Sequence, residues 1–107
     1  MAAEDTFIFN DSNFSDTTAS GVSLVDLYAD WCGPCKIMVP TIDKLASSFK
    51  DKAVVGKLNV DDSQGTAGQL GVTSIPTVVI FKDGQEVERY VGVQSEAALT
   101  SAIEKHL

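Results

Sequence analysis

Two cysteines separated by two residues, Cys32 and Cys35, are the side chains of this sequence best suited to chemistry. The chain has no other cysteine, and its single histidine, His106, stands next to the C-terminus. If a helix begins at this point, the two Cα atoms lie about 5 Å apart, given ~1.5 Å of rise and ~100° of turn per residue. That separation is inside the ~4.4–6.8 Å range of disulfides. The spacing therefore lets a disulfide form and break with little backbone movement.

The two sulfur atoms are expected to differ in reactivity. Cys32 would face the unpaired amides and the positive dipole end of the helix, which favour its thiolate, whereas Cys35 would lie one turn further in with less solvent. Cys32 is therefore predicted to attack a substrate disulfide, and Cys35 to resolve the mixed disulfide. Gly33 and Pro34 stand between the two cysteines. A histidine at either position would stabilise the Cys32 thiolate and make the disulfide more oxidising, so Gly33 and Pro34 are expected to tune the redox potential toward that of a reductant. Pro34 also suits a first helical turn.

Other uses of the same two cysteines stay open at this point. A structural disulfide, two buried thiols, or half of a metal or cluster site shared between two chains would need no turnover. Within one chain, a structural zinc site usually needs four ligands, and cysteine and histidine together number three. A binding module in which redox turnover is incidental is a further alternative. The position at a strand-to-helix junction of a β-α-β unit favours the redox interpretation, with no metal site.

The elements that position this pair follow from the hydrophobic periodicity. It predicts strands at 7–9, 22–29, 53–60, 77–81 and 86–91, and helices at 10–18, 34–49, 63–70 and 95–106. The early β-α-β unit predicts parallel strands with a right-handed crossover, and Asp83-Gly84 predicts an antiparallel hairpin. The sequence therefore predicts one α/β domain over residues 1–107, with a mixed sheet between helices.

Several local features are also expected. Asp11 or Ser12 should cap the first helix, and Asp61, Asp62 and Ser63 should cap the third. Pro40 should kink the long helix. One apolar face of that helix should point inward, consisting of Ile37, Met38, Ile42, Leu45, Ala46 and Phe49.

Asp26 lies in the middle of the second predicted strand, between Val25 and Leu27. A carboxylate buried in such a strand loses its hydration, which raises its pKa. The alternative is an edge strand on which Asp26 faces solvent. The apolar neighbours favour the buried acid.

Charge and hydropathy limit the partners. The net charge is −7 with no basic cluster, so nucleic acid and anionic membranes are poor partners. No apolar run approaches the ~18 residues of a membrane span. No signal peptide is visible, which favours the cytoplasm, although an organellar stroma or matrix protein would look the same after removal of a transit peptide. A monomer is the simplest expectation.

The sequence resembles the thioredoxin family over essentially its whole length. The match includes residues 31–36, which read Trp-Cys-Gly-Pro-Cys-Lys, and the later Ile-Pro-Thr at 75–77. It also includes Asp26, Pro40, Lys57, Asp61, Gly84 and Gly92. The resemblance implies the thioredoxin fold, a five-stranded mixed sheet flanked by four helices in three layers. It implies reduction of protein disulfides with no bound cofactor, the dithiol being recharged by a thioredoxin reductase from NADPH or by a ferredoxin-dependent reductase.

The same resemblance implies roles for single residues. Asp26 would remove the Cys35 proton through water, with Lys57 modulating it. The bond between Ile75 and Pro76 would be cis and packed against the disulfide. Substrates would bind at a small patch made of Trp31, Val60, Ile75, Pro76, Val91 and Gly92. Two positions depart from the common pattern: Tyr28 stands where many members have tryptophan, and Ser74 where some have glycine.

Overall fold

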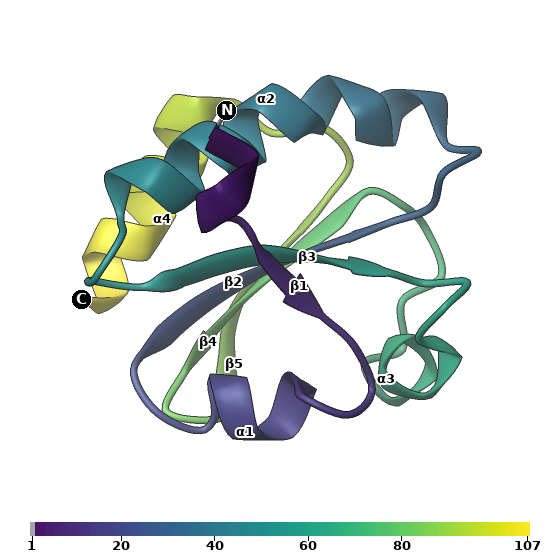
Figure 1. The fold of residues 1–107 in the computed structure, drawn as a ribbon, viewed down its shortest axis with the longest axis horizontal. Coiled ribbons are helices and arrows are strands. Elements are labelled where there is room, and N and C mark those ends of the chain that lie inside the picture. The colour runs from purple at the N-terminus through teal and green to yellow at the C-terminus, as the bar shows by residue number, and fades with distance from the viewer. Residues whose placement is uncertain (1) are drawn as a thin grey trace.

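The computed structural model describes residues 2–107 as a central sheet with helices on both sides (Figure 1). The strands are β1 Phe7–Phe9, β2 Val22–Tyr28, β3 Val54–Asn59, β4 Thr77–Lys82 and β5 Gln85–Val91. The helices are α1 Phe14–Thr18, α2 Gly33–Ser48, α3 Gln64–Gln69 and α4 Glu96–His106, preceded by a 3-10 turn at Ala2–Asp5. Apart from that turn, the predicted order of elements is confirmed, with boundaries displaced by one to a few residues.

The five strands are ordered β1-β3-β2-β4-β5. β3 pairs in parallel with both β1 and β2, as the β-α-β units require. β4 runs antiparallel to both β2 and β5. Asp83 and Gly84 join β4 to β5 with positive φ angles of 50° and 84°, which confirms the predicted hairpin.

The helices form two layers, with α2 and α4 on one face of the sheet and α1 and α3 on the other (Figure 1). Successive residues of a strand point to opposite faces, so each strand in the middle of the sheet supplies both layers. The core beneath α2 and α4 includes Leu24, Met38, Ile42, Leu45, Ile80, Leu99 and Ile103. The core beneath α1 and α3 includes Phe9, Phe14, Val25, Leu27, Leu58 and Phe81.

β2 is the central strand, and every residue in it except Tyr28 is buried. Its carboxyl end leads through 29–31 directly into α2. A rigid, doubly covered strand therefore fixes the point at which α2 begins, which is where the two cysteines lie.

The inward face of α2 differs from the prediction at one residue. Ile37 is 64% exposed, whereas Met38, Ile42 and Leu45 are fully covered. Ile37 precedes Met38 by one residue, and the ~100° turn per residue carries its side chain off the buried face. α2 continues without a break through Pro40.

The predicted caps of α1, Asp11 and Ser12, are wrong, whereas Ser63 occupies the predicted N-cap position of α3. α1 is preceded by Asn13, and the loop before it is closed by Asn10, whose Oδ1 accepts from the N–H groups of Ser12 and Asn13. Asp11 acts elsewhere: its Oδ1 accepts hydrogen bonds from the Thr66 N–H at 2.8 Å and the Thr66 hydroxyl at 2.7 Å. Asp11 thus caps the first turn of α3, at which Ser63 makes no side-chain cap. α4 is capped by Ser95 as expected.

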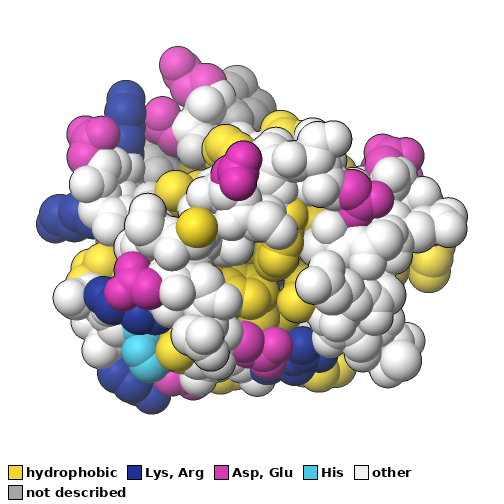
Figure 2. Space-filling model, turned by 90° about the horizontal axis from the view of Figure 1, so that it is seen from below, with side chains coloured by type: hydrophobic (Ala, Val, Ile, Leu, Met, Phe, Trp, Pro, Cys, Tyr) yellow, Lys and Arg dark blue, Asp and Glu magenta, His cyan; other side chains and the backbone are white. Residues whose placement is uncertain are grey.

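The face over α1 and α3 is mixed in character. Figure 2, which views this side, shows hydrophobic side chains in the middle of the face with acidic and basic side chains around them. A shallow hollow of about 470 Å³ lies here, with Phe14, Leu70 and Phe81 among its lining residues. None of the helices in residues 2–107 has the length and hydrophobicity that crossing a membrane requires.

Candidate active site

Cys32 and Cys35 form a disulfide at the start of α2. Their Cα atoms are 5.3 Å apart, as the helical spacing predicts. Cys32 is the N-cap residue, with extended backbone angles of φ −88° and ψ 109°, and Cys35 lies in the first turn. Pro34 occupies the first turn as well, where its missing N–H has no partner to lose.

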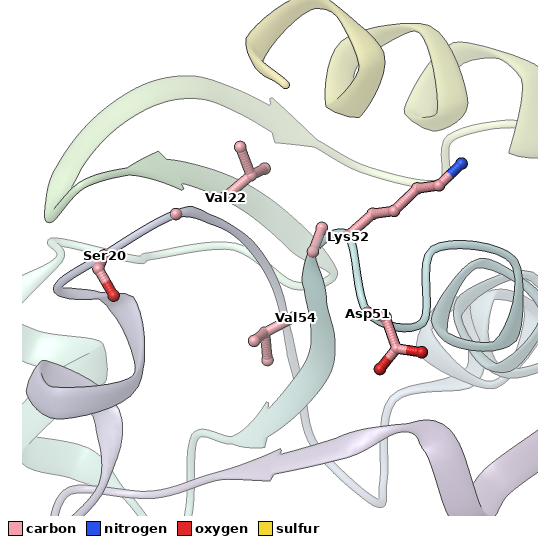
Figure 3. A pocket seen from close by; sticks show the side chains of 7 residues that line it. Ser20, Val22, Asp51, Lys52 and Val54 are labelled. Carbon is pink, nitrogen blue, oxygen red and sulfur yellow. The ribbon is translucent and has the colours of Figure 1, made fainter.

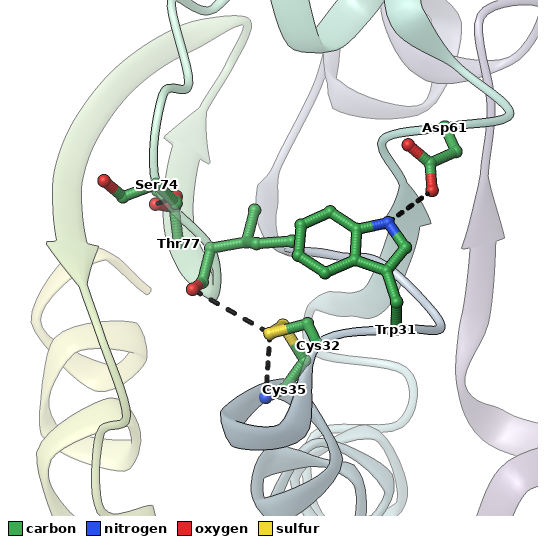
Figure 4. Close-up of a disulfide and its surroundings, with 7 residues drawn as sticks. Trp31, Cys32, Cys35, Asp61, Ser74 and Thr77 are labelled. Carbon is green, nitrogen blue, oxygen red and sulfur yellow. Dashed lines mark hydrogen bonds between the residues drawn. A yellow bond between two sulfur atoms is a disulfide. The ribbon is translucent and has the colours of Figure 1, made fainter.

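The two sulfur atoms have different surroundings. The backbone N–H of Cys35 donates a hydrogen bond to the Cys32 Sγ over 3.2 Å (Figure 4). This amide belongs to the unpaired first turn of α2, so the positive end of the helix dipole also acts on the Cys32 sulfur. After reduction, the same hydrogen bond and dipole would stabilise a thiolate at Cys32.

The burial of the pair is more complete than predicted. Cys35 is 2% exposed and Cys32 only 5%, so the expected order holds but Cys32 does not protrude. Ala29 completes this buried cluster, and Tyr28, Val60 and Ile75 pack around it. Cys32 therefore lies just beneath an apolar surface.

The loop before β4 lies against the disulfide. The bond between Ile75 and Pro76 is cis, as the resemblance implies. The carbonyl oxygen of Ile75 is 3.9 Å from the Cys32 Sγ. Pro76 is buried, and its carbonyl accepts a hydrogen bond from the Gly92 N–H over 2.8 Å. The structure therefore brings Ile75, Pro76 and Gly92 together beside the cysteines.

Trp31 lies at the surface next to the disulfide and is 72% exposed. Its Nε1–H donates to the Asp61 Oδ2 over 2.9 Å, and Figure 4 shows the indole reaching toward this carboxylate. Sequence reasoning treated Asp61 as a helix cap and missed this contact. The separation of 30 residues gives no local signal, and only the pairing of β2 with β3 brings the two together.

The apolar patch expected around the disulfide is assembled in the structure. Val60 and Ile75 are partly buried against the cysteines, and Val91 is 62% exposed and pairs with Thr77 across β4 and β5. Val93, 47% exposed, follows Gly92 and was not predicted. The sites for substrate contact named from the sequence therefore share one end of the sheet.

Asp26 is buried on β2, with 3% of its surface exposed. Loss of hydration raises the pKa of this carboxyl from 3.8 to about 7, while the positive charge of Lys57 opposes the rise. Lys57 lies directly opposite Asp26 on β3. The Oδ1 atom of Asp26 has no hydrogen-bond partner within residues 2–107. The buried acid and its neighbouring lysine are thus confirmed in position.

A hollow of about 170 Å³ lies beside Lys57. Cys35, Lys57 and Tyr28 line it, together with Ala29, Asp30, Lys36 and Val39. The second cysteine and the lysine that stands opposite Asp26 therefore border one small space.

A larger hollow of about 400 Å³ lies between the amino ends of β2 and β3 (Figure 3). Its charged side chains, Asp51 and Lys52, point in different directions in Figure 3, so they do not converge on a ligand. In the part of the chain that the structure describes, no group of three or more His, Cys, Asp or Glu side chains is placed to hold a metal ion.

Comparisons with known proteins agree with this geometry. The family model described as thioredoxin matches residues 5–105. A thioredoxin of Staphylococcus saprophyticus is 50% identical over 97 residues, covering 91% of this chain and 93% of the relative. A thioredoxin of Staphylococcus haemolyticus is 46% identical with the same coverage. The solved structure of a mutant thioredoxin from Halobacterium salinarum has a TM-score of 0.86 and 40% identity, covering 95% of this chain and 91% of that one.

A mixed sheet with helices on both faces and a disulfide at the start of α2 define a protein-disulfide oxidoreductase whose own two cysteines carry the electrons. The chain belongs to the thioredoxin family and has the thioredoxin fold. The redox interpretation of the Cys32–Cys35 pair is thereby favoured over a purely structural disulfide.

Proposed function

We propose that the chain reduces disulfides of other proteins, with Cys32 as the nucleophile, Cys35 as the resolving thiol and Asp26 as the acid and base. One observation supports this assignment above all others: the Cys35 N–H donates to the Cys32 Sγ at the first turn of α2. That contact favours negative charge on one sulfur and not on the other.

In the first step the Cys32 thiolate attacks one sulfur of the target disulfide. A mixed disulfide forms, and the other target sulfur leaves as a thiolate. In the second step the Cys35 thiol gives its proton to the Asp26 carboxylate through water. The Cys35 thiolate then attacks the Cys32 Sγ, which releases the second target sulfur as a thiolate. The target gains two electrons and the chain ends as the Cys32–Cys35 disulfide.

The position and pKa of Asp26 support its part in this sequence. A pKa of about 7 leaves the carboxyl partly ionised at neutral pH, so it can both accept and return a proton. Its side chain points to the face of the sheet that α2 covers, as do those of Leu24 and Val55. Cys35 lies at the start of that same helix.

The apolar patch supports docking of an unfolded or extended target segment. Trp31, Val60, Ile75, Val91 and Gly92 offer a small surface, so many partners can bind and leave. The backbone of Ile75 would pair with an extended peptide in the manner of an added strand. Disulfide-containing proteins are the expected targets.

The oxidised chain would be returned to its dithiol form by a thioredoxin reductase that draws on NADPH, or by a ferredoxin-dependent reductase. The chain itself would bind no cofactor. The bacterial thioredoxins among its relatives support a cytoplasmic location and a reductase partner of the same general kind. We expect the chain to work as a monomer.

A reduction assay tests the proposal. Insulin disulfides should be reduced when the chain is supplied with dithiothreitol, or with a reductase using NADPH or ferredoxin in separate arms. Cys32→Ser should abolish turnover, and Cys35→Ser should trap a mixed disulfide with the target. If the Cys32→Ser, Cys35→Ser double variant kept full biological function, the chain would instead be a binding module.

A further inference from the structure

Tyr28 lies beside the buried acid without being part of the proposed proton transfer. It follows Asp26 by two residues on β2, and Lys57 stands opposite Asp26 on the parallel strand β3. Residues two apart on a strand share a face, and partners in register on neighbouring strands share it too. Asp26, Tyr28 and Lys57 therefore all point toward α2 and Cys35.

The ammonium group of Lys57 lies over the ring of Tyr28. Its Nζ lies 5.4 Å from the ring centroid, within the range of a cation–π interaction. Residues 2–107 include no ion pair between Lys57 and Asp26, although adjacent strands are only about 4.8 Å apart. The Asp26 Oδ1 atom is left without a partner. The single cation next to the buried carboxyl thus faces an aromatic ring.

We propose that Tyr28 is a positioning residue for the proton transfer, because its ring holds the Lys57 ammonium group away from the Asp26 carboxyl. This inference rests on the proposed function, in which Asp26 exchanges a proton with Cys35. A direct ion pair would stabilise the carboxylate and make it a weaker base toward the Cys35 thiol. The aromatic ring competes with the Asp26 carboxylate for the Lys57 ammonium group and takes no part in moving the proton itself.

Other charged groups lie around the same space. Asp30 and Lys36 line the same hollow and are exposed to solvent. Asp62, also exposed, acts on Tyr28 from the segment after β3. Of the titratable groups that line this hollow, α2 contributes Cys35 and Lys36. Because the exposed charges are screened by salt, the ring and Lys57 remain the dominant neighbours of Asp26.

The test is an NMR titration of the Asp26 carboxyl carbon in the reduced full-length chain. Tyr28→Met removes the ring but fills the space with a flexible apolar side chain, and Tyr28→Phe keeps the ring. Each change is made with Lys57 present and in a Lys57→Met background.

With Lys57 present, Tyr28→Met should lower the pKa of Asp26 by about one pH unit, the lower end of the effect of a close opposite charge. Tyr28→Phe should leave it unchanged, and in the Lys57→Met background Tyr28→Met should have no effect.

If Tyr28→Met lowered the pKa of Asp26 equally in both backgrounds, the inference would be overturned, because the ring would then act only by excluding water. No fall in either background would overturn it as well. If Tyr28→Met does not fold, Tyr28→Leu takes its place in the same set of variants.

A second measurement is the pH profile of the resolving step. In Tyr28→Met the midpoint of this profile should move in the same direction as the pKa of Asp26. Failure of the proposed function would appear differently: Asp26 would titrate as expected, but Asp26→Asn would not slow resolution.

Discussion

Asp26 and Lys57 stand opposite each other on β2 and β3, yet they do not form an ion pair. The carboxyl is 3% exposed, and one of its oxygens has no hydrogen-bond partner among residues 2–107. Its pKa of about 7 comes mainly from lost hydration, which the lysine only partly offsets. A group in this condition costs folding free energy at neutral pH but exchanges protons readily there.

The first prediction concerns stability. Asp26→Asn should raise the free energy of unfolding by roughly 4 kcal/mol at pH 8, because the folded chain no longer has to bury a carboxylate. The pKa of Asp26 is higher when folded, so its protonated form contributes stability that is complete below pH 3.8 and lost as the pH rises through about 7. Urea unfolding at pH 4 and pH 8 measures the effect.

At pH 4 the parent and the Asn variant should be nearly equal in stability, since both side chains are then neutral. A variant that is less stable than the parent at pH 8 would show that Asp26 is well paired or hydrated. In the same variant, resolution of the mixed disulfide at pH 7 should be slower than in the parent, and stopped-flow mixing with a labelled substrate measures its rate.

The second prediction concerns the bond between Trp31 and Asp61. Asp61→Ala should release the indole and weaken docking, raising KM for a protein disulfide by about three- to tenfold, the equivalent of one hydrogen bond. The kcat should stay near that of the parent, because no atom at the sulfurs changes. Steady-state insulin reduction gives both constants. Asp62→Ala, which removes the neighbouring exposed carboxylate, is the matched control. Equal effects of the two variants would point to surface charge instead.

The third prediction concerns Asp11, which caps α3 from the loop after β1. Asp11→Ala should lower Tm by several degrees, because the Thr66 N–H and hydroxyl both lose their acceptor. Ser12→Ala, one residue away on the same loop, should leave Tm close to that of the parent. Differential scanning calorimetry compares the three proteins. If both variants melted like the parent, Asp11 would have no capping role in solution.

The fourth prediction concerns Glu88, which ties β5 to the end of α4. Its Oε2 accepts from Lys105 Nζ at 3.0 Å and lies 2.9 Å from His106 Nε2, and the Tyr90 hydroxyl donates to Oε1. These hydrogen bonds lower the pKa of Glu88 from 4.5 to about 2. The stabilisation is therefore present above pH 4.5 and lost as the pH falls through about 2. Glu88→Gln should lower Tm at pH 7, and the difference from the parent should shrink steadily below pH 4.5. A difference that is constant with pH would contradict the account.

Much of the fold can be predicted from the sequence because its signals are local. The apolar run of β2, the Asp83-Gly84 turn and the Ser95 cap each involve a few neighbouring residues. The helical spacing of Cys32 and Cys35 likewise predicts their disulfide, and this prediction uses no contact with other parts of the chain. Burial of Asp26 follows from its apolar neighbours on the strand.

What could not be predicted depends on contacts between distant segments. Asp11 reaches Thr66 across 55 residues, and Asp61 reaches Trp31 across 30. Both aspartates follow a strand and precede a helix, so local sequence rules predict that each caps the helix that follows it. The near-complete burial of Cys32 has the same origin, since Val60 and Ile75 come from other parts of the chain. The cis bond before Pro76 was predicted from the family resemblance and not from local sequence.

The pKa of Cys32 in the reduced chain tests the central claim most directly. Thiolate absorbance or rates of iodoacetamide alkylation across pH, with Cys35→Ser as the variant that isolates Cys32, give this value. The hydrogen bond from the Cys35 N–H and the dipole of α2 should hold the pKa of Cys32 below the ~8.5 of a free cysteine, with alkylation at pH 7 far faster at Cys32 than at Cys35. A Cys32 that titrates like free cysteine, or two thiols of equal reactivity, would contradict the account.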